Sequence, residues 1–355
     1  MSRFLRAAYQ TIDAYAPGEQ PREGVLIKLN TNESPFPPSP GVLAALDPAA
    51  AERLNRYSDP TLSDLKAAIA DREGLTAEQV TAGNGSDEVL ALAFLAFGGR
   101  GVAFADITYG FYRVWAAFFG LRSQIVPLRE DFSIGVDDYD GAAGMVVLAN
   151  PNAPTGRAIG PDAVVRLAAA DRGRLVVVDE AYVEFGCDSA ARLIDACDNL
   201  LVVRTFSKSH SLAGARLGYA LGCRALIQDL EKMRYSFNPY NVNRLSMLAG
   251  VAAMRDEDYY ARCRASIARE RGRLADALAS MGFEVLPSRA NFLFARHAAL
   301  PGAAYADQLR QRGILIRRFD GPRIADFSRV TVGAPGEVDA VIAATSDILK
   351  AGGGA

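Results

Sequence analysis

The chain has 355 residues, of which 50% are hydrophobic and 23% are charged, and its formal net charge is −2. This length favours two domains, or a large domain with a smaller one, and the composition is typical of a soluble globular protein. The near-neutral charge does not favour binding to nucleic acid or to an anionic membrane surface. No apolar run reaches the roughly 18 to 20 residues of a membrane span. The first 16 residues lack the apolar core of a secretory signal, so we expect a cytoplasmic protein.

Rare residue types narrow the chemistry further. The four cysteines have no CxxC spacing, and His210 and His297 are the only histidines. We therefore expect reduced thiols and no metal site. The 39 basic residues include only five lysines, one of which is Lys208 in a Ser- and Thr-rich segment. Lysine can lose its proton and attack a carbonyl, whereas arginine stays protonated, so Lys208 is a candidate for covalent chemistry.

Short apolar runs in the first two thirds of the chain predict buried strands. We expect strands at residues 101–105, 123–126, 145–148, 175–178, 200–203 and 217–221. Helical patterns lie between them, as at residues 86–97 and 161–170. Strands that alternate with helices indicate an α/β fold with a mostly parallel sheet flanked by helices.

The last third has a different pattern. Residues 256–281 predict one long helix, and residues 337–350 predict a closing helix. Strands are expected between these helices at residues 291–295, 314–317 and 329–332. The proline-rich residues 35–40 are interpreted as a linker. We therefore predict an N-terminal arm (1–40) that joins the smaller domain, a large domain (41–255) and a smaller C-terminal α/β domain (256–355).

Polar residues follow three of the predicted strands, at 150–156, 179–182 and 205–209. Ligands of open α/β sheets bind outside the carboxyl ends of the strands. A fourth segment, 83–88, places glycines before a predicted helix whose free N–H groups can hold a phosphate. Each segment alone is explained by a turn or a helix cap. The four together, in this order, favour a functional site.

Three of these segments resemble signatures of the class I/II aminotransferases, which are fold-type I enzymes dependent on pyridoxal 5′-phosphate (PLP). They are NPNAPTG (150–156), VVDEAYVEF (177–185) and RTFSKSHSLAGARLGY (204–219). Within that group the chain resembles the histidinol-phosphate aminotransferases, through LNTNES (29–34), GNGSDE (83–88) and RVTVG (329–333). The resemblance extends over nearly the whole chain.

The resemblance implies transamination between histidinol phosphate (imidazole-acetol phosphate in reverse) and glutamate or 2-oxoglutarate, as in histidine biosynthesis. Two alternatives keep the fold and the cofactor: an aromatic or other amino-acid aminotransferase, and a threonine-phosphate decarboxylase. Which bond at Cα breaks depends on its orientation to the cofactor ring, which sequence does not determine. A third alternative is a regulatory module that keeps the fold without catalysis, and the presence of Lys208 and Asp179 speaks against it.

The resemblance also implies catalytic roles. Lys208 holds PLP covalently and later moves the proton between Cα and the cofactor. Asp179 pairs with the pyridine nitrogen and keeps it protonated. Asn152 and Tyr182 bond the 3′ oxygen, and Tyr109 stacks on the ring.

The cofactor phosphate is expected at the start of the helix that follows residue 85. The residues implied are Gly85, Ser86 and Asp87 through their N–H groups, Thr205 and Ser207 through their hydroxyls, and Arg216 through its guanidinium. Tyr57 reaches the phosphate of a neighbouring subunit in the family, which implies a homodimer with shared sites.

Substrate binding is expected at the other side of the cofactor. Arg329 matches the arginine that holds the anionic group of the substrate, and Arg317 matches a second one or is a solvated charge at a strand end. Tyr15 and Asn32 are expected to line the pocket from the N-terminal arm. His210, two residues after Lys208, is interpreted as a packed loop histidine.

Overall fold

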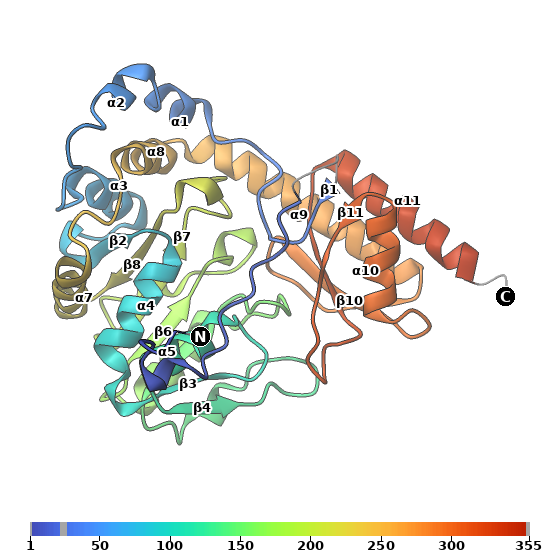
Figure 1. Cartoon of the computed structure of the whole chain (residues 1–355), viewed down its shortest axis with the longest axis horizontal. Helices are drawn as coiled ribbons and strands as arrows, with labels where there is room; N and C mark the ends of the chain where they lie inside the picture. The colour runs from blue at the N-terminus through green and yellow to red at the C-terminus, as the bar shows by residue number, and fades with distance from the viewer. Residues whose placement is uncertain (1, 22–26, 353–355) are drawn as a thin grey trace.

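A computed structural model of the chain describes residues 2–21 and 27–352. Its centre is a seven-stranded sheet in the order β2-β8-β7-β6-β5-β3-β4 (Figure 1). The strands are β2 (Val80–Gly83), β3 (Val102–Ala105), β4 (Ser123–Val126), β5 (Met145–Ala149), β6 (Val176–Asp179), β7 (Leu200–Thr205) and β8 (Gly218–Gly222). β8 is antiparallel to both neighbours, and the other pairs are parallel. The predicted mostly parallel sheet and its six predicted strands are confirmed, and β2 is an addition.

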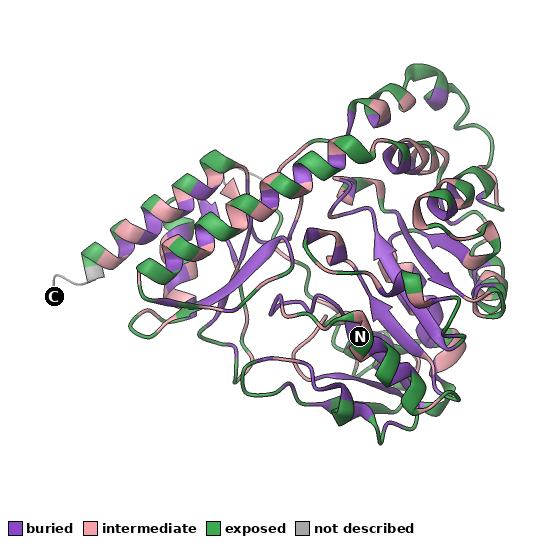
Figure 2. Cartoon of the chain, turned by 180° about the vertical axis from the view of Figure 1, so that it is seen from behind, coloured by how far each residue is buried: buried purple, intermediate pink, exposed green. Residues whose placement is uncertain are grey.

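Helices cover both faces of this sheet, so its strands are buried on both sides, except that the edge strand β4 is largely exposed. Alternate residues face opposite ways: Val176 and Val202 pack with one cluster, and Val177 and Val203 with the other. The first face is covered by α3 (Ser63–Glu73), α6 (Pro161–Ala170) and α8 (Arg244–Arg255), and the second by α4 (Ser86–Phe97), α5 (Phe111–Phe118) and α7 (Arg224–Phe237). Figure 2 shows the strands buried and the outer sides of the helices exposed. The predicted helices at 86–97 and 161–170 are confirmed.

The smaller C-terminal unit contains an antiparallel sheet in the order β12-β13-β10-β9. Its strands are β9 (Phe283–Val285), β10 (Phe292–His297), β12 (Arg317–Arg318) and β13 (Ser328–Thr331). Its helices are α9 (Glu257–Ser280), α10 (Gly302–Gln311) and α11 (Pro335–Gly352). The long helix α9 runs from the end of α8 into this unit (Figure 1). The predicted long and closing helices are confirmed as α9 and α11.

One predicted strand, at 314–317, is wrong as a single element. The structure has β11 (Ile314–Leu315) and β12 on either side of Ile316, and they belong to different sheets. β11 pairs in parallel with β1 (Ile27–Lys28) of the N-terminal arm, whereas β12 pairs with β13. A change of partner needs a change of backbone direction, which apolar pattern alone does not reveal.

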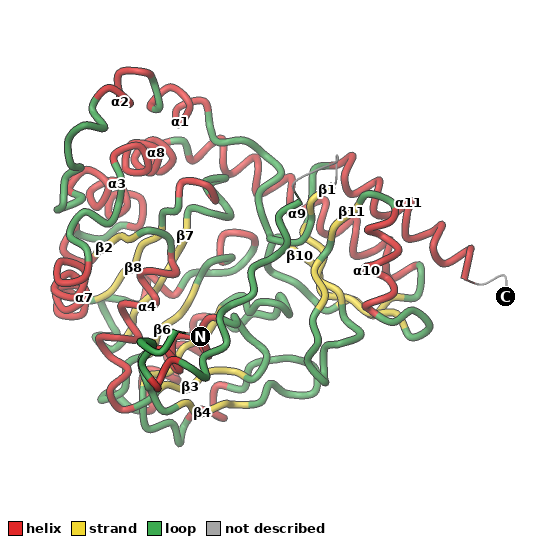
Figure 3. The backbone as a smooth tube through the Cα atoms, viewed as in Figure 1, coloured by secondary structure: helices red, strands yellow, loops and turns green. Residues whose placement is uncertain are grey.

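The N-terminal arm crosses between the two units (Figures 1 and 3). Tyr9 stacks on Phe118 of α5 at 5.3 Å between ring centroids, and Tyr15 stacks on Phe111 at 4.1 Å. The start of the arm therefore contacts the large sheet layer, whereas its later part contacts the smaller unit, where Glu19 pairs with Arg310 and β1 pairs with β11. The expected linker at 35–40 ends in a helix, because Pro40 begins α1 (Pro40–Ala45). The division at residues 40 and 255 stays a prediction.

Two further observations concern the whole described part of the chain. No helix among the described residues combines the length and the apolar character needed to cross a membrane. Residues 2–21 and 27–352 also contain no group of three or more His, Cys, Asp or Glu side chains placed to hold a metal ion.

Candidate active site

A cavity of about 640 Å³ lies at the carboxyl ends of β5, β6 and β7, between the large sheet, the arm and the smaller unit. Parallel strands present their carboxyl ends at one edge, which brings segments distant in sequence together. The predicted residues that line it are Tyr15, Asn32, Ser86, Asp87, Tyr109, Asp179, Tyr182, Thr205, Ser207, Lys208, Arg216, Arg317 and Arg329. Gly85, Asn152 and Tyr57 are the predicted site residues that do not line it.

Lys208 follows β7 and extends its amine into this cavity. Its Nζ donates a hydrogen bond to the backbone oxygen of Thr31, 2.9 Å away in the arm. Burial, together with the positive charge of Arg329, lowers the pKa of Lys208 to about 8. About a tenth of this amine is therefore neutral at pH 7, and a nucleophilic amine has to be neutral to attack.

Asp179 ends β6 at the floor of the cavity. Its Oδ2 accepts a hydrogen bond from the Tyr112 hydroxyl at 2.8 Å, and its Oδ1 accepts one from the Ala181 N–H at 3.1 Å. Burial raises the pKa of Asp179 to about 6. In the described part of the chain no Lys, Arg or His side chain forms an ion pair with it. The arrangement therefore suits a cationic group brought by a ligand.

Tyr112 was not predicted, although it carries this hydrogen bond. The sequence contains a usable signal, because Tyr112 follows Tyr109 by three residues. Tyr109 lies just before α5 and Tyr112 lies in its first turn, so a polar aromatic residue this close to a predicted site residue is itself a candidate. Both rings pack with Trp115 of α5, and Tyr109 and Tyr112 are perpendicular at 5.7 Å.

The start of α4 forms an anion-binding corner. Gly85 is the residue before the helix, its φ is +83°, and no side chain caps the first turn. A Cβ on Gly85 would lie 2.6 Å from Arg216 Nη2, and a Cβ on Gly218 would lie 2.2 Å from the Ser86 nitrogen. Glycine is therefore required where the helix start, the guanidinium and β8 meet. Free N–H groups beside an arginine are suited to a phosphate.

Neighbouring side chains complete this corner. The Thr205 and Ser207 hydroxyls lie 3.0 Å apart beside the end of β7. Asp87 accepts a hydrogen bond from Arg216 Nη2 at 3.0 Å and another from the Tyr109 hydroxyl at 2.8 Å. The Asp87 carboxylate thus holds Arg216 and Tyr109 in place, whereas the backbone N–H of Asp87 belongs to the first turn of α4.

The arm contributes one wall through Asn32. Its Nδ2 donates to the Tyr182 hydroxyl at 2.9 Å, and its N–H donates to Thr331 Oγ1 at 3.0 Å. Asn32 has φ of +56°, an uncommon conformation that these buried contacts hold. Burial raises the pKa of Tyr182, so its hydroxyl keeps its proton.

Arg317 and Arg329 stand opposite each other on the paired strands β12 and β13. Arg329 Nη2 donates to the Asn30 backbone oxygen at 2.8 Å, and its Nε is buried without a hydrogen-bond partner. Arg317 donates to the backbone oxygens of Ala16 and Pro17 at 3.2 and 3.3 Å. Neither guanidinium pairs with an acidic side chain of residues 2–21 or 27–352. Two unneutralised cations therefore border the cavity and favour an anionic ligand.

Besides Gly85, two predicted residues lie outside the cavity. Asn152 is fully buried, and its amide donates to the Ile107 oxygen at 2.9 Å and to Thr155 Oγ1 at 3.0 Å. One of these bonds has to be released before Asn152 can bond a ligand. Tyr57 is 78% exposed and stacks on Tyr240 at 4.4 Å. Its expected contact with a neighbouring subunit stays a prediction.

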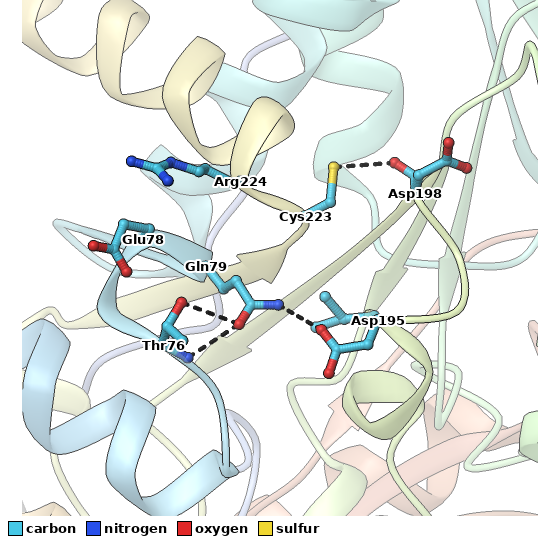
Figure 4. A pocket seen from close by; sticks show the side chains of 8 residues that line it. Thr76, Glu78, Gln79, Asp195, Asp198, Cys223 and Arg224 are labelled. Atoms are coloured by element: carbon cyan, nitrogen blue, oxygen red, sulfur yellow. Dashed lines mark hydrogen bonds between the residues drawn. The ribbon is translucent and has the colours of Figure 1, made fainter.

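A second hollow lies at the opposite end of the sheet, where Asp198 precedes β7 and Cys223 follows β8 (Figure 4). The Cys223 thiol donates to the Asp198 backbone oxygen at 3.3 Å, and Gln79 donates to Asp195 at 2.8 Å. Thr76, Gln79, Asp195 and the Cys223 thiol thus have hydrogen-bond partners within this hollow, and the hollow does not share the composition of the first cavity.

Comparisons with known proteins agree with this geometry. The family described as "Aminotransferase class I and II" matches residues 25–344. Histidinol-phosphate aminotransferase 1 of Bordetella parapertussis is 49% identical over 355 residues, covering 99% of this chain and 100% of that protein. Histidinol-phosphate aminotransferase 2 of Dechloromonas aromatica is 49% identical over 354 residues, covering 98% and 99%.

Solved structures are similar over the same extent. Histidinol-phosphate aminotransferase from Sinorhizobium meliloti, in complex with pyridoxal-5′-phosphate, has a TM-score of 0.90 at 28% identity and covers 99% of both chains. L-threonine-O-3-phosphate decarboxylase from Porphyromonas gingivalis has a TM-score of 0.81 at 21% identity, covering 92% and 100%, which shows a shared fold only. Given the family match over most of its length and relatives 49% identical from end to end, the chain belongs to the class I and II aminotransferases.

Proposed function

We propose that the chain transfers an amino group between histidinol phosphate and 2-oxoglutarate, with PLP as cofactor, as a step of histidine biosynthesis. The observation that carries this proposal is the pair of unneutralised arginines, Arg317 and Arg329, at the substrate side of an aminotransferase cavity. The full-length relatives that bear this name, at 49% identity, support the choice of substrate.

The donor set of the cavity fits PLP at three points. Asp179 is a buried carboxylate without a cation from the described residues, which suits a protonated pyridine nitrogen. The start of α4 with Arg216 suits the dianionic phosphate, and Gly85 leaves the space for it. The Lys208 amine, with its lowered pKa, suits attack on an aldehyde. When bound, PLP supplies an electron sink for the substrate's Cα.

The protein's own residues then have separate tasks. Lys208 would hold and move the proton at Cα. Asp179 would keep the ring nitrogen protonated, and the Tyr182 hydroxyl would donate to the 3′ oxygen. Tyr109, whose hydroxyl donates to Asp87, would pack on the ring. The bond from Asn152 to the same oxygen stays part of the proposal.

Arg317 and Arg329 provide for two different substrates in turn. Histidinol phosphate carries a phosphate but no carboxylate, whereas 2-oxoglutarate carries two carboxylates. A guanidinium binds either kind of anion through two parallel hydrogen bonds. The same two arginines can therefore accept both substrates, with Tyr15 and Asn32 closing the pocket from the arm.

We further propose that the enzyme is a cytoplasmic homodimer in which Tyr57 reaches the partner's cofactor phosphate. Large apolar side chains are exposed on α1, in the chain between α1 and Tyr57, at and just after the end of α7, and on α8: Leu43, Leu46, Leu54, Phe237, Tyr240 and Leu248. Clustered exposed apolar side chains mark interaction surfaces. Analytical ultracentrifugation tests the assembly, and a monomer at micromolar concentration would refute it.

An assay of substrate choice tests the proposed reaction. Purified enzyme with PLP is given 2-oxoglutarate and one of three substrates: histidinol phosphate, phenylalanine or threonine phosphate. We expect glutamate to form fastest from histidinol phosphate. Faster turnover of phenylalanine would assign the chain to aromatic amino acids instead. Release of carbon dioxide from threonine phosphate would assign it to decarboxylation.

A further inference from the structure

Behind Lys208, on the side away from the cavity, lies a buried cluster of polar side chains with no part in the mechanism above. We call it the Glu184 cluster; its members are Arg72, Glu184, Ser209, His210 and Glu257. They come from α3, the short helix η5 (Val183–Phe185), the loop after β7, and the first turn of α9. Four separate parts of the chain therefore meet directly beside the cavity lysine.

Glu184 is the centre of the hydrogen bonds. It accepts one from the Ser209 hydroxyl and another from Arg72 Nη2. Arg72 also pairs with Glu257 of α9 at 2.8 Å, which connects the cluster to the helix that leads into the smaller unit. Because Arg72 and Glu184 are largely buried, removing one of them leaves the other without compensation.

His210 fits this network as a neutral side chain of one tautomer. Burial lowers the pKa of His210 to about 3. Its Nε2 lies 2.6 Å from Arg72 Nη1, and a guanidinium can only donate, so Nε2 accepts and the ring proton is on Nδ1. Nδ1 then donates to the Ser209 hydroxyl at 3.0 Å, which leaves the Ser209 proton for Glu184. The direction of each hydrogen bond is therefore fixed.

The bond between Ser209 and Glu184 joins the two segments that carry the proposed chemistry. Ser209 is next to Lys208, and Glu184 is two residues after Tyr182 in the segment that begins at Asp179. Strand pairing of β6 with β7 fixes these segments only up to their ends. Directly after β6, Glu180 still bonds to Val203 and Arg204 of β7, and further along the two segments the Ser209–Glu184 bond holds one against the other.

We propose that Glu184 and Ser209 are positioning residues, which fix the Lys208 amine relative to the ring held by Asp179 and Tyr182. This inference rests on the proposed role of Lys208. A reacting group held loosely by about 1 Å can lose on the order of 100-fold in rate. The cluster therefore contributes to catalysis without touching substrate or cofactor.

The test compares Ser209→Ala with a matched control, Ser189→Ala. Ser189 also donates its hydroxyl to a buried glutamate, Glu180 at 2.6 Å, but it lies outside the Lys208 loop. For Ser209→Ala we expect kcat to fall about 10- to 100-fold with KM nearly unchanged. We also expect weaker visible circular dichroism of the bound PLP at equal absorbance, because the ring and the lysine are less rigidly held. The control should change neither quantity.

A double-mutant cycle with Glu184→Gln shows whether the two residues act as one unit. If they do, the double variant loses no more activity and dichroism than the less active of the two single variants. If the two residues act independently, the two losses multiply. Should Glu184→Gln fail to fold, Ser209→Ala against its control still decides. Equal kcat and dichroism for Ser209→Ala and Ser189→Ala, or multiplied losses in the cycle, overturns the proposal. A yellow Lys208→Ala protein would instead overturn the assigned role of Lys208.

Discussion

The structure makes a quantitative prediction for Asp179→Asn in the cofactor-free protein. Burial raises the pKa of Asp179 from 3.8 to about 6. A shift of roughly two units corresponds to about 3 kcal/mol, at 1.36 kcal/mol for each unit. The raised pKa means that the folded protein binds this proton more tightly than the unfolded chain. Proton binding by Asp179 therefore stabilises the folded protein fully below about pH 4, and this stabilisation is lost as the pH rises through about 6.

Asparagine does not ionise, so the variant avoids the cost of burying the charged Asp179 carboxylate at high pH. At pH 8 we expect cofactor-free Asp179→Asn to unfold with a free energy up to about 3 kcal/mol higher than the parent. At pH 5 the Asp179 carboxyl group of the folded parent is mostly protonated, and the difference in unfolding free energy between variant and parent should narrow by about 1.4 kcal/mol. Changes in the hydrogen bonds to Tyr112 and Ala181 should alter the unfolding free energy equally at pH 5 and pH 8. The change of the difference between the two pH values therefore reports the ionisation of Asp179 alone.

Urea unfolding of both cofactor-free proteins at pH 5 and pH 8 measures this difference. With PLP bound the order should reverse, because a ring cation offsets the buried carboxylate only in the parent. A difference that stays constant between the two pH values would refute the reasoning, since Asp179 would then not titrate as a buried, unpaired carboxylate. Equal PLP affinity of parent and variant would refute its pairing with the ring nitrogen.

Three further substitutions test other parts of the site. Lys208→Ala should abolish transamination and the visible absorbance near about 420 nm, and a variant that stays yellow would contradict its role. Arg329→Gln should raise KM for 2-oxoglutarate by about 30-fold or more, and Arg317→Gln should raise it less. Arg329→Gln should also raise the pKa of Lys208, because it removes a neighbouring cation. Equal effects of the two variants on KM would contradict the assignment. Tyr112→Phe removes a hydrogen-bond donor to Asp179, so the pKa of Asp179 should rise by about one unit or more. As the pH is lowered, PLP affinity should therefore begin to fall at a higher pH than in the parent. An unchanged pH profile of PLP binding would contradict this.

The sequence by itself determined the fold class and most of the cofactor side of the site. Six strands of the central sheet follow from short runs rich in apolar residues, because strands covered by helices on both faces are mostly apolar. Lys208 and Asp179 follow from polar residues placed where such strands end, and their segments match family signatures. Features of this kind depend on residues that are consecutive in the chain, so they can be predicted without knowledge of the fold.

Other features depend on contacts between distant segments. The split of residues 314–317 into β11 and β12 is decided by the partners β1 and β13, which lie elsewhere in the chain. The family resemblance named Asn32 and Arg329 as pocket residues, yet only the folded arm shows the bonds that hold each side chain. Tyr112 had no place in any motif.

The Glu184 cluster shows the same division most clearly. Sequence identified His210 only as a loop residue near Lys208, and Arg72 and Glu257 not at all. Their charges are far apart in the chain and acquire a function only when α3, η5 and α9 pack around one loop. The sequence thus determined which groups can do chemistry, whereas tertiary structure decided how they are held, because burial and hydrogen-bond partners arise only when separate elements pack together.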